Sequence, residues 1–129
     1  MSDNKEILTR YYDRVFNSRE VGAIAEYWAD EKMQAAVTRG CISYLDSFPD
    51  LHISLEELIE EDGRVFVRST MTGTHDGEYK GIAPTGRNVA ADCAEIYRLT
   101  DGKIVGYWCQ LDVAGLMRQL TEERVAASV

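Results

Sequence analysis

The sequence has few of the residues that cross-link small proteins or bind metals. Its 129 residues include three cysteines, two histidines and two prolines. Cys41, Cys93 and Cys109 are odd in number and form no C-x-x-C pair, which is typical of reduced thiols in a cytoplasmic protein. The two histidines, His52 and His75, are far apart, and no acidic cluster follows the calcium-loop pattern. We therefore expect no bound metal.

Long apolar runs and clustered basic residues are also scarce. No run approaches the roughly 20 residues that cross a membrane. The amino end, MSDNKEILTR, has no signal-peptide pattern. With 14 basic and 22 acidic side chains, the net charge is −8, whereas nucleic acids and anionic membranes attract clustered Lys and Arg. We expect a cytoplasmic protein whose partners include neither nucleic acid nor membrane.

Sequence patterns for nucleotide cofactors are missing as well. The segment 81–88, GIAPTGRN, has the glycine spacing of a phosphate-binding loop but lacks its Lys and Ser/Thr. A strand pattern follows it where such a loop would begin a helix, so a loop joining two strands explains it better. No G-x-G-x-x-G turn is present. The sequence predicts no cofactor, and any catalysis has to come from side chains.

The size and composition are those of one domain. A chain of 129 residues with 45% hydrophobic residues falls in the single-domain range. It is long enough to bury a hydrophobic core without a disulfide or a metal. We expect a single domain over residues 1–129.

The first half of the chain has helical periodicity. Apolar residues recur at i, i+3 and i+4 from Ile7 to Phe16, which predicts an amphipathic helix. A second helix is predicted from Val21 to about Ala36, and a third, shorter one from Thr38 to Phe48. Pro49 ends the third helix, because the residue before a proline avoids the helical region.

After Pro49 the sequence alternates with the two-residue period of strands. The predicted strands begin at Leu51 and then cover Val65–Thr74, Asn88–Leu99 and Ile104–Leu111. Asp-Gly dipeptides at 62–63 and 101–102 predict tight hairpin turns, and a last helix follows residue 112. Helices first and antiparallel strands afterwards predict an α+β fold with helices on one face of a curved sheet.

Polar residues in two of these strands are the candidates for chemistry. In the last strand, Trp108, Gln110 and Asp112 share one face. In the strand before Gly77, Met71, Gly73 and His75 share one face in the same way. A carboxylate and an imidazole facing an apolar cavity would form a general acid/base pair. Alternatively, Asp112 caps the last helix and His75 is a turn residue. Asp92 is a weaker candidate, because a charge there is typical of a solvated strand position.

Aromatic residues are the candidates for a binding pocket. Core packing explains most of them, but a pocket for a planar apolar ligand uses the same residue types, with tyrosine hydroxyls at its edges. Both interpretations stay open. The residues expected to contact a small hydrophobic or aromatic substrate are Tyr12, Trp28, Tyr44, Trp108 and Gln110.

Short motifs follow one another from residue 48 to residue 120. They are FPDL at 48–51, GRV at 63–65, GTHDG at 73–77, GIAPTGR at 81–87, DGKI at 101–104 and D-x-x-GL-x-x-QL at 112–120. In this order and spacing the chain resembles the SnoaL-like polyketide cyclase family. The resemblance covers most of the chain from residue 48 onward.

This resemblance implies a cone-shaped α+β barrel, similar to ketosteroid isomerase and scytalone dehydratase, in which a curved antiparallel sheet encloses an apolar cavity. SnoaL-like cyclases of antibiotic biosynthesis close a ring of a polyketide by intramolecular aldol condensation, without metal or cofactor. By the family's pattern the catalytic acid/base is Asp112, and the cavity histidine is His75. The resemblance also implies a homodimer.

The resemblance leaves other activities open, because the same fold hosts cofactor-free hydroxylases, isomerases and proteins that only bind a ligand or dimerise. The sequence also departs from the family in two places. The stretch from Ala29 to Leu45 looks shortened, and this stretch is expected at the mouth of the cavity. Tyr107 stands where many relatives have a histidine.

Overall fold

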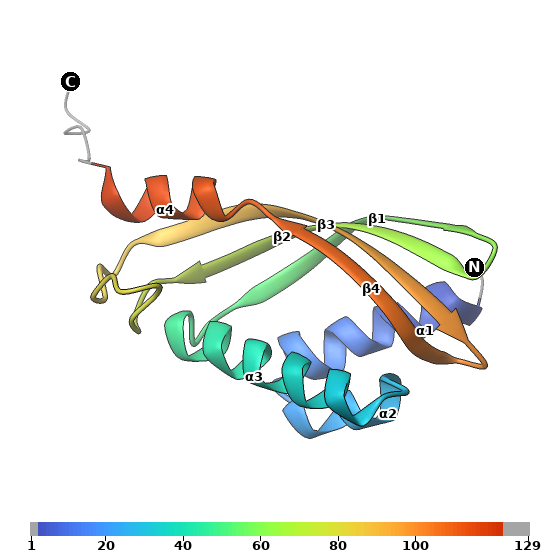
Figure 1. Ribbon diagram of the computed structural model, residues 1–129. Coiled ribbons are helices and arrows are strands. Elements are labelled where there is room, and N and C mark those ends of the chain that lie inside the picture. The colour runs from blue at the N-terminus through green and yellow to red at the C-terminus, as the bar shows by residue number, and fades with distance from the viewer. Residues whose placement is uncertain (1–2, 123–129) are drawn as a thin grey trace.

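The computed structural model describes residues 3–122, with the main helices first and the strands after them (Figure 1). The helical elements are α1 (Asp3–Tyr11), the π-helical turn η1 (Tyr12–Asn17), the 3₁₀ turn η2 (Val21–Ala23), α2 (Ile24–Tyr27), α3 (Glu31–Ser47) and α4 (Val113–Thr121). The strands are β1 (His52–Glu61), β2 (Arg64–Thr74), β3 (Asn88–Thr100) and β4 (Lys103–Leu111).

The four strands form one antiparallel sheet in the order β1-β2-β3-β4. Figure 1 shows that the sheet is strongly twisted and that α1, α2 and α3 lie together on one side of it, while α4 extends from the far end of β4. The expected α+β fold is confirmed. None of the helices within residues 3–122 is long and apolar enough to cross a membrane.

Two tight turns join the strands at the predicted places. Asp62 and Gly63 have φ of 52° and 75°, and Asp101 and Gly102 have φ of 50° and 77°. Positive φ at both central residues is the geometry of the type I′ turn, whose twist matches that of the flanking strands. Both hairpins are confirmed, and they fix which strands are neighbours.

The helix boundaries after Val21 differ from the prediction. The chain leaves the helical conformation at Trp28, which is extended, and α3 then runs without a break from Glu31 to Ser47. Asp30 explains the restart, because its side chain accepts a hydrogen bond from the Met33 amide and so caps α3. The predicted boundary between Ala36 and Thr38 is therefore wrong.

A β-bulge at Val105 changes which residues of β4 face inward. Ile104 is fully buried and lies opposite Leu99, whereas Gly106 lies opposite Arg98, so the pairing skips Val105. Side chains alternate between the two faces of a strand, and an extra residue shifts this alternation by one position. The even-numbered inward row that begins at Ile104 therefore does not continue along β4.

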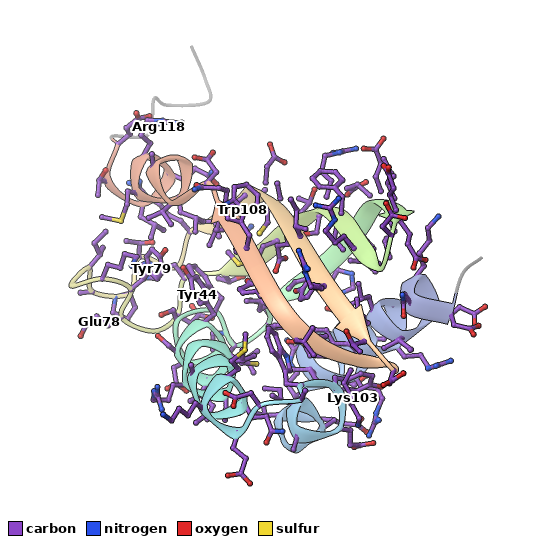
Figure 2. All side chains as sticks on the ribbon, turned by 45° about the vertical axis from the view of Figure 1, so that its right-hand side comes forward. Tyr44, Glu78, Tyr79, Lys103, Trp108 and Arg118 are labelled. Carbon is purple, nitrogen blue, oxygen red and sulfur yellow. The ribbon has the colours of Figure 1, made fainter. Side chains whose placement is uncertain are left out.

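The inward row after the bulge is Tyr107, Cys109 and Leu111. The prediction that the row of Trp108 and Gln110 faces the cavity is wrong, because both side chains lie on the outer face. Figure 2 shows Trp108 projecting from β4 away from α3, and 49% of its surface is exposed.

Candidate active site

A pocket of about 400 Å³ lies between the helices and the inner face of the sheet. Its walls come from α1, η1 and α3 on one side and from all four strands on the other. Most of its lining is aromatic, aliphatic or sulfur-containing. Such a pocket suits a small apolar ligand, with orientation set by its few polar groups.

Within residues 3–122, Glu95 is the one carboxylate that lines the pocket, and no lysine or arginine lines it. Glu95 is 6% exposed. The Tyr12 hydroxyl donates to Oε1 over 2.6 Å, and the Tyr97 hydroxyl donates to Oε2 over 2.7 Å. A buried carboxylate needs such donors, so the two tyrosines hold Glu95 in one orientation at the pocket wall.

The two tyrosines are suited to donating. Burial, and after it the nearby charge of Glu95, raises the pKa of Tyr12 well above its usual range. Burial is also the main reason that the pKa of Tyr97 is raised, and the neighbouring Tyr12 is the second reason. Both hydroxyls therefore stay protonated at neutral pH, and they lie 2.7 Å from each other.

Three of the four aromatic substrate-binding candidates from the sequence lie in this pocket, whereas Trp108 does not. Tyr12, Trp28 and Tyr44 all belong to its lining. The Trp28 indole donates to the Tyr11 hydroxyl over 3.2 Å. The Tyr44 hydroxyl lies 3.0 Å from that of Tyr79, and Figure 2 shows the two side by side at the end of α3. Burial raises the pKa of Tyr44 above its usual range.

Three thiols also line the pocket. Cys93 Sγ lies 3.7 Å from Cys109 Sγ and 3.5 Å from Glu95 Oε1. The hydrogen bond between the two thiols is the main reason that the pKa of Cys93 is raised while the pKa of Cys109 is lowered to about 7. Cys41 lies apart on α3, and burial raises its pKa to about 11.

His75 lies outside the pocket lining. It is fully buried, its ring lies 5.8 Å from that of Phe48, and its Nδ1 accepts a hydrogen bond from the Thr85 amide over 3.1 Å. The backbone of His75 also pairs with Gly86 and Arg87. These contacts hold the loop of residues 81–88 against the end of β2, so a catalytic role for His75 stays a prediction.

Asp112 also lies outside the pocket. Its carboxylate accepts from the Gly115 amide over 2.9 Å and caps α4, and its side chain is exposed. It lines an open groove on the outer face of the sheet together with Asp92 and Gln110. The fold thus separates Asp112 from His75 and from Tyr12, Trp28 and Tyr44, and a catalytic role for Asp112 stays a prediction.

Glu95 was not predicted from the sequence, although β3 carries a signal for it. Alternate residues of β3 from Val89 to Leu99 face inward, and Glu95 is the one charged residue in that row. Asp92 belongs to the other, outward row. The two-residue period therefore distinguishes the two acidic residues once one buried position of the strand is known.

The family of the chain follows from its sequence. The family model for the SnoaL-like polyketide cyclase matches residues 6–120. The chain belongs to this family. The resemblance that its motifs indicate is confirmed, and the residues before position 48 are included in the match.

Solved structures of the same fold superpose closely. AclR from Streptomyces galilaeus, a proposed hydroxylase, is 26% identical, with a TM-score of 0.82 over 99% of this chain and 87% of that chain. A proposed polyketide cyclase from Acidithiobacillus ferrooxidans is 23% identical, with a TM-score of 0.82 over 92% of this chain and 94% of that chain. IdmH from Streptomyces antibioticus, also a proposed polyketide cyclase, is 21% identical, with a TM-score of 0.78 over 92% and 99%. No curated protein matches the chain significantly.

Proposed function

We propose that this SnoaL-like protein is a cofactor-independent cyclase that closes a ring of a small polyketide-like molecule by intramolecular aldol chemistry, with Glu95 as its acid/base. The observation that carries the proposal is the placement of Glu95, a buried carboxylate held by two tyrosine hydroxyls at the wall of an apolar pocket. Membership of the cyclase family supports the reaction class.

The proposed reaction needs one proton acceptor that later returns the proton. Glu95 takes a proton from a carbon that lies between two carbonyl groups, which leaves an enolate. The enolate carbon attacks a second carbonyl of the same molecule, so a carbon–carbon bond forms and the attacked oxygen becomes an alkoxide. The carboxylic acid of Glu95 returns its proton to that oxygen. A positioned carboxylate contributes roughly 10²–10⁴-fold to such a step.

The surrounding residues have supporting roles in this proposal. Tyr12 and Tyr97 are positioning residues, because they fix both carboxylate oxygens of Glu95. Trp28 and Tyr44 form apolar walls that bind the rings of the substrate. The apolar lining limits the access of water, which would otherwise protonate the enolate before it attacks the second carbonyl.

Turnover by two carboxylate variants tests the assignment. Aromatic β-keto esters with a further ketone group, which the enolate can attack, serve as substrates. Chromatography with mass spectrometry detects a ring-closed product. Glu95→Gln should lower kcat by roughly 10²-fold or more, whereas Asp112→Asn should remain active. Loss of activity in Asp112→Asn alone, with both variants folded, would transfer the acid/base role to Asp112. An equal loss of activity in His75→Asn would assign His75 to the acid/base machinery as well.

Cofactor-free hydroxylation is a second candidate, which the likeness to AclR favours. A hydroxylase would consume oxygen and add the mass of one oxygen atom to its product, whereas an aldol ring closure leaves the mass unchanged. An oxygen electrode with a quinol substrate separates the two. A third alternative, a protein that binds without catalysis, would bind the esters but convert none of them.

We further propose that the chain forms a homodimer through the outer face of the sheet. A row of apolar residues in register crosses all four strands there: Ile59, Phe66, Ile96 and Trp108. Ile59 and Trp108 are 58% and 49% exposed, and a continuous apolar row of this kind is typical of an interface. Light scattering should give the mass of two chains, and Ile96→Lys should give one. Ile42→Lys, on an exposed position of α3, is the control that should leave the mass unchanged.

A further inference from the structure

Three side chains that are ligands for zinc in other proteins meet at the inner face of β3 and β4. Cys93 and Glu95 are two residues apart on β3, and Cys109 lies opposite Glu95 on β4. Their sulfur and oxygen atoms all lie within 4.8 Å of one another. The sequence spacing shows no such cluster, because the second cysteine comes from the neighbouring strand and faces inward only after the bulge at Val105.

Two of the three distances in this cluster match the edges of a zinc tetrahedron, and the third is within 4.8 Å. With Zn–S bonds of about 2.3 Å and a Zn–O bond of about 2.1 Å, tetrahedral angles place two sulfurs about 3.8 Å apart and a sulfur and an oxygen about 3.6 Å apart. The two Sγ atoms are 3.7 Å apart, and Cys93 Sγ lies 3.5 Å from Glu95 Oε1. Cys93 therefore already lies at zinc-ligand spacing from both Cys109 and Glu95.

The electrostatic surroundings favour a cation at this point. Once both thiols are deprotonated, they and the carboxylate carry three negative charges, and within residues 3–122 no lysine or arginine lines the pocket to balance them. Tyr12 and Tyr97 hydrogen-bond the carboxylate of Glu95, an arrangement that commonly orients metal ligands. Thiolate ligands select zinc over magnesium and calcium, which prefer oxygen.

We propose that Cys93, Glu95 and Cys109 form a zinc-binding site with its fourth position open to the pocket. Binding deprotonates both thiols, so one Zn²⁺ enters and two protons leave. A bound metal would take the carboxylate of Glu95 as a ligand, so this carboxylate would no longer be free to accept a proton. If Glu95 is the acid/base of the proposed function, zinc inhibits the enzyme, and this consequence alone rests on that function. Zinc binding itself does not depend on it.

Metal titration of the full chain, stripped of metal and reduced, tests the site without any activity measurement. Competition with a chromophoric chelator should show one Zn²⁺ bound per chain. Co²⁺ in its place should give the intense visible bands of a tetrahedral ion and a thiolate-to-cobalt band in the near ultraviolet. Cys93→Ser and Cys109→Ser should each weaken binding by at least about 100-fold, and Tyr12→Phe by about 10-fold, as expected for an outer-shell partner.

Cys41→Ser is the matched control, because Cys41 is the third cysteine of the chain and lines the same pocket. It should bind zinc as tightly as the unchanged protein. Absence of the thiolate band, or equal weakening by all three serine variants, would overturn the proposal. A reduced protein that binds no zinc but forms a Cys93–Cys109 disulfide with hydrogen peroxide would also overturn it and identify the two cysteines as a redox pair.

Discussion

Replacing Tyr12 with phenylalanine should destabilise the fold by about 2 kcal/mol, because it removes a tyrosine donor to the buried carboxylate of Glu95. The Tyr12 side chain is 1% exposed, and its hydroxyl lies 2.6 Å from Glu95 Oε1. A hydrogen bond to a carboxylate contributes roughly 1.5–3 kcal/mol, and the group left behind keeps its desolvation cost. Tyr97 still donates to the other oxygen, so the middle of this range is expected.

Tyr79→Phe is the matched comparison. Tyr79 is also buried, but its hydroxyl lies 3.0 Å from a neutral group, the hydroxyl of Tyr44. A neutral pair contributes about 1 kcal/mol. The free energy of unfolding, measured by urea denaturation with circular dichroism, should therefore fall about 1 kcal/mol further in Tyr12→Phe than in Tyr79→Phe.

A double-mutant cycle isolates the interaction between Tyr12 and Glu95. The effects of Tyr12→Phe and Glu95→Gln should not add, and the coupling free energy should be about 1 kcal/mol or more, because the two residues are in direct contact. Equal losses in the two tyrosine variants, or an additive cycle, would show that the Tyr12 hydroxyl does not hold the carboxylate.

Three further predictions concern the fold and the thiols. In Gly77→Ala the new Cβ would stand 1.9 Å from the Asp46 carbonyl oxygen, so the free energy of unfolding, measured by thermal denaturation, should fall by about 3 kcal/mol. Gly40 has open space around it, so the free energy of unfolding of Gly40→Ala should rise by about 0.5–1 kcal/mol. Asp112→Ala removes the cap of α4, so its free energy of unfolding should be about 1 kcal/mol lower in the same assay. A much larger decrease would show that capping is not the main role of Asp112. Because burial raises the pKa of Cys41 to about 11, its alkylation followed by mass spectrometry should be slow at pH 7 and accelerate up to about pH 11. Fast alkylation at pH 7 would contradict that shift.

The sequence predicted the main features of the fold because these depend on local patterns. The two Asp-Gly dipeptides adopt positive φ at both residues, which few other residue pairs do easily, so they specify hairpins by themselves. The change of hydrophobic period near Pro49 separates helices from strands. The boundary between the second and third helices was missed because Asp30, whose side chain caps α3, lies within a continuous apolar pattern.

The candidate site was only partly predictable. Tyr12, Trp28 and Tyr44 were singled out as aromatic residues and do line the pocket. Glu95 could have been found from the alternation in β3, where it is the one charged residue of the inward row. The inward position of Cys109 could not be found in this way, because the bulge at Val105 shifts the alternation of β4 by one residue.

The fold class, the hairpins and the family could be read from the sequence, since each depends on neighbouring residues or on the order of motifs. Which side chains meet in the pocket depends on the tertiary structure. Strand pairing places Cys109 beside Glu95, 14 residues away in the chain, and packing of η1 on the sheet places the Tyr12 hydroxyl against the same carboxylate. Such contacts depend on strand register and on a single bulge, and a shift of one residue turns every later side chain of a strand to the opposite face.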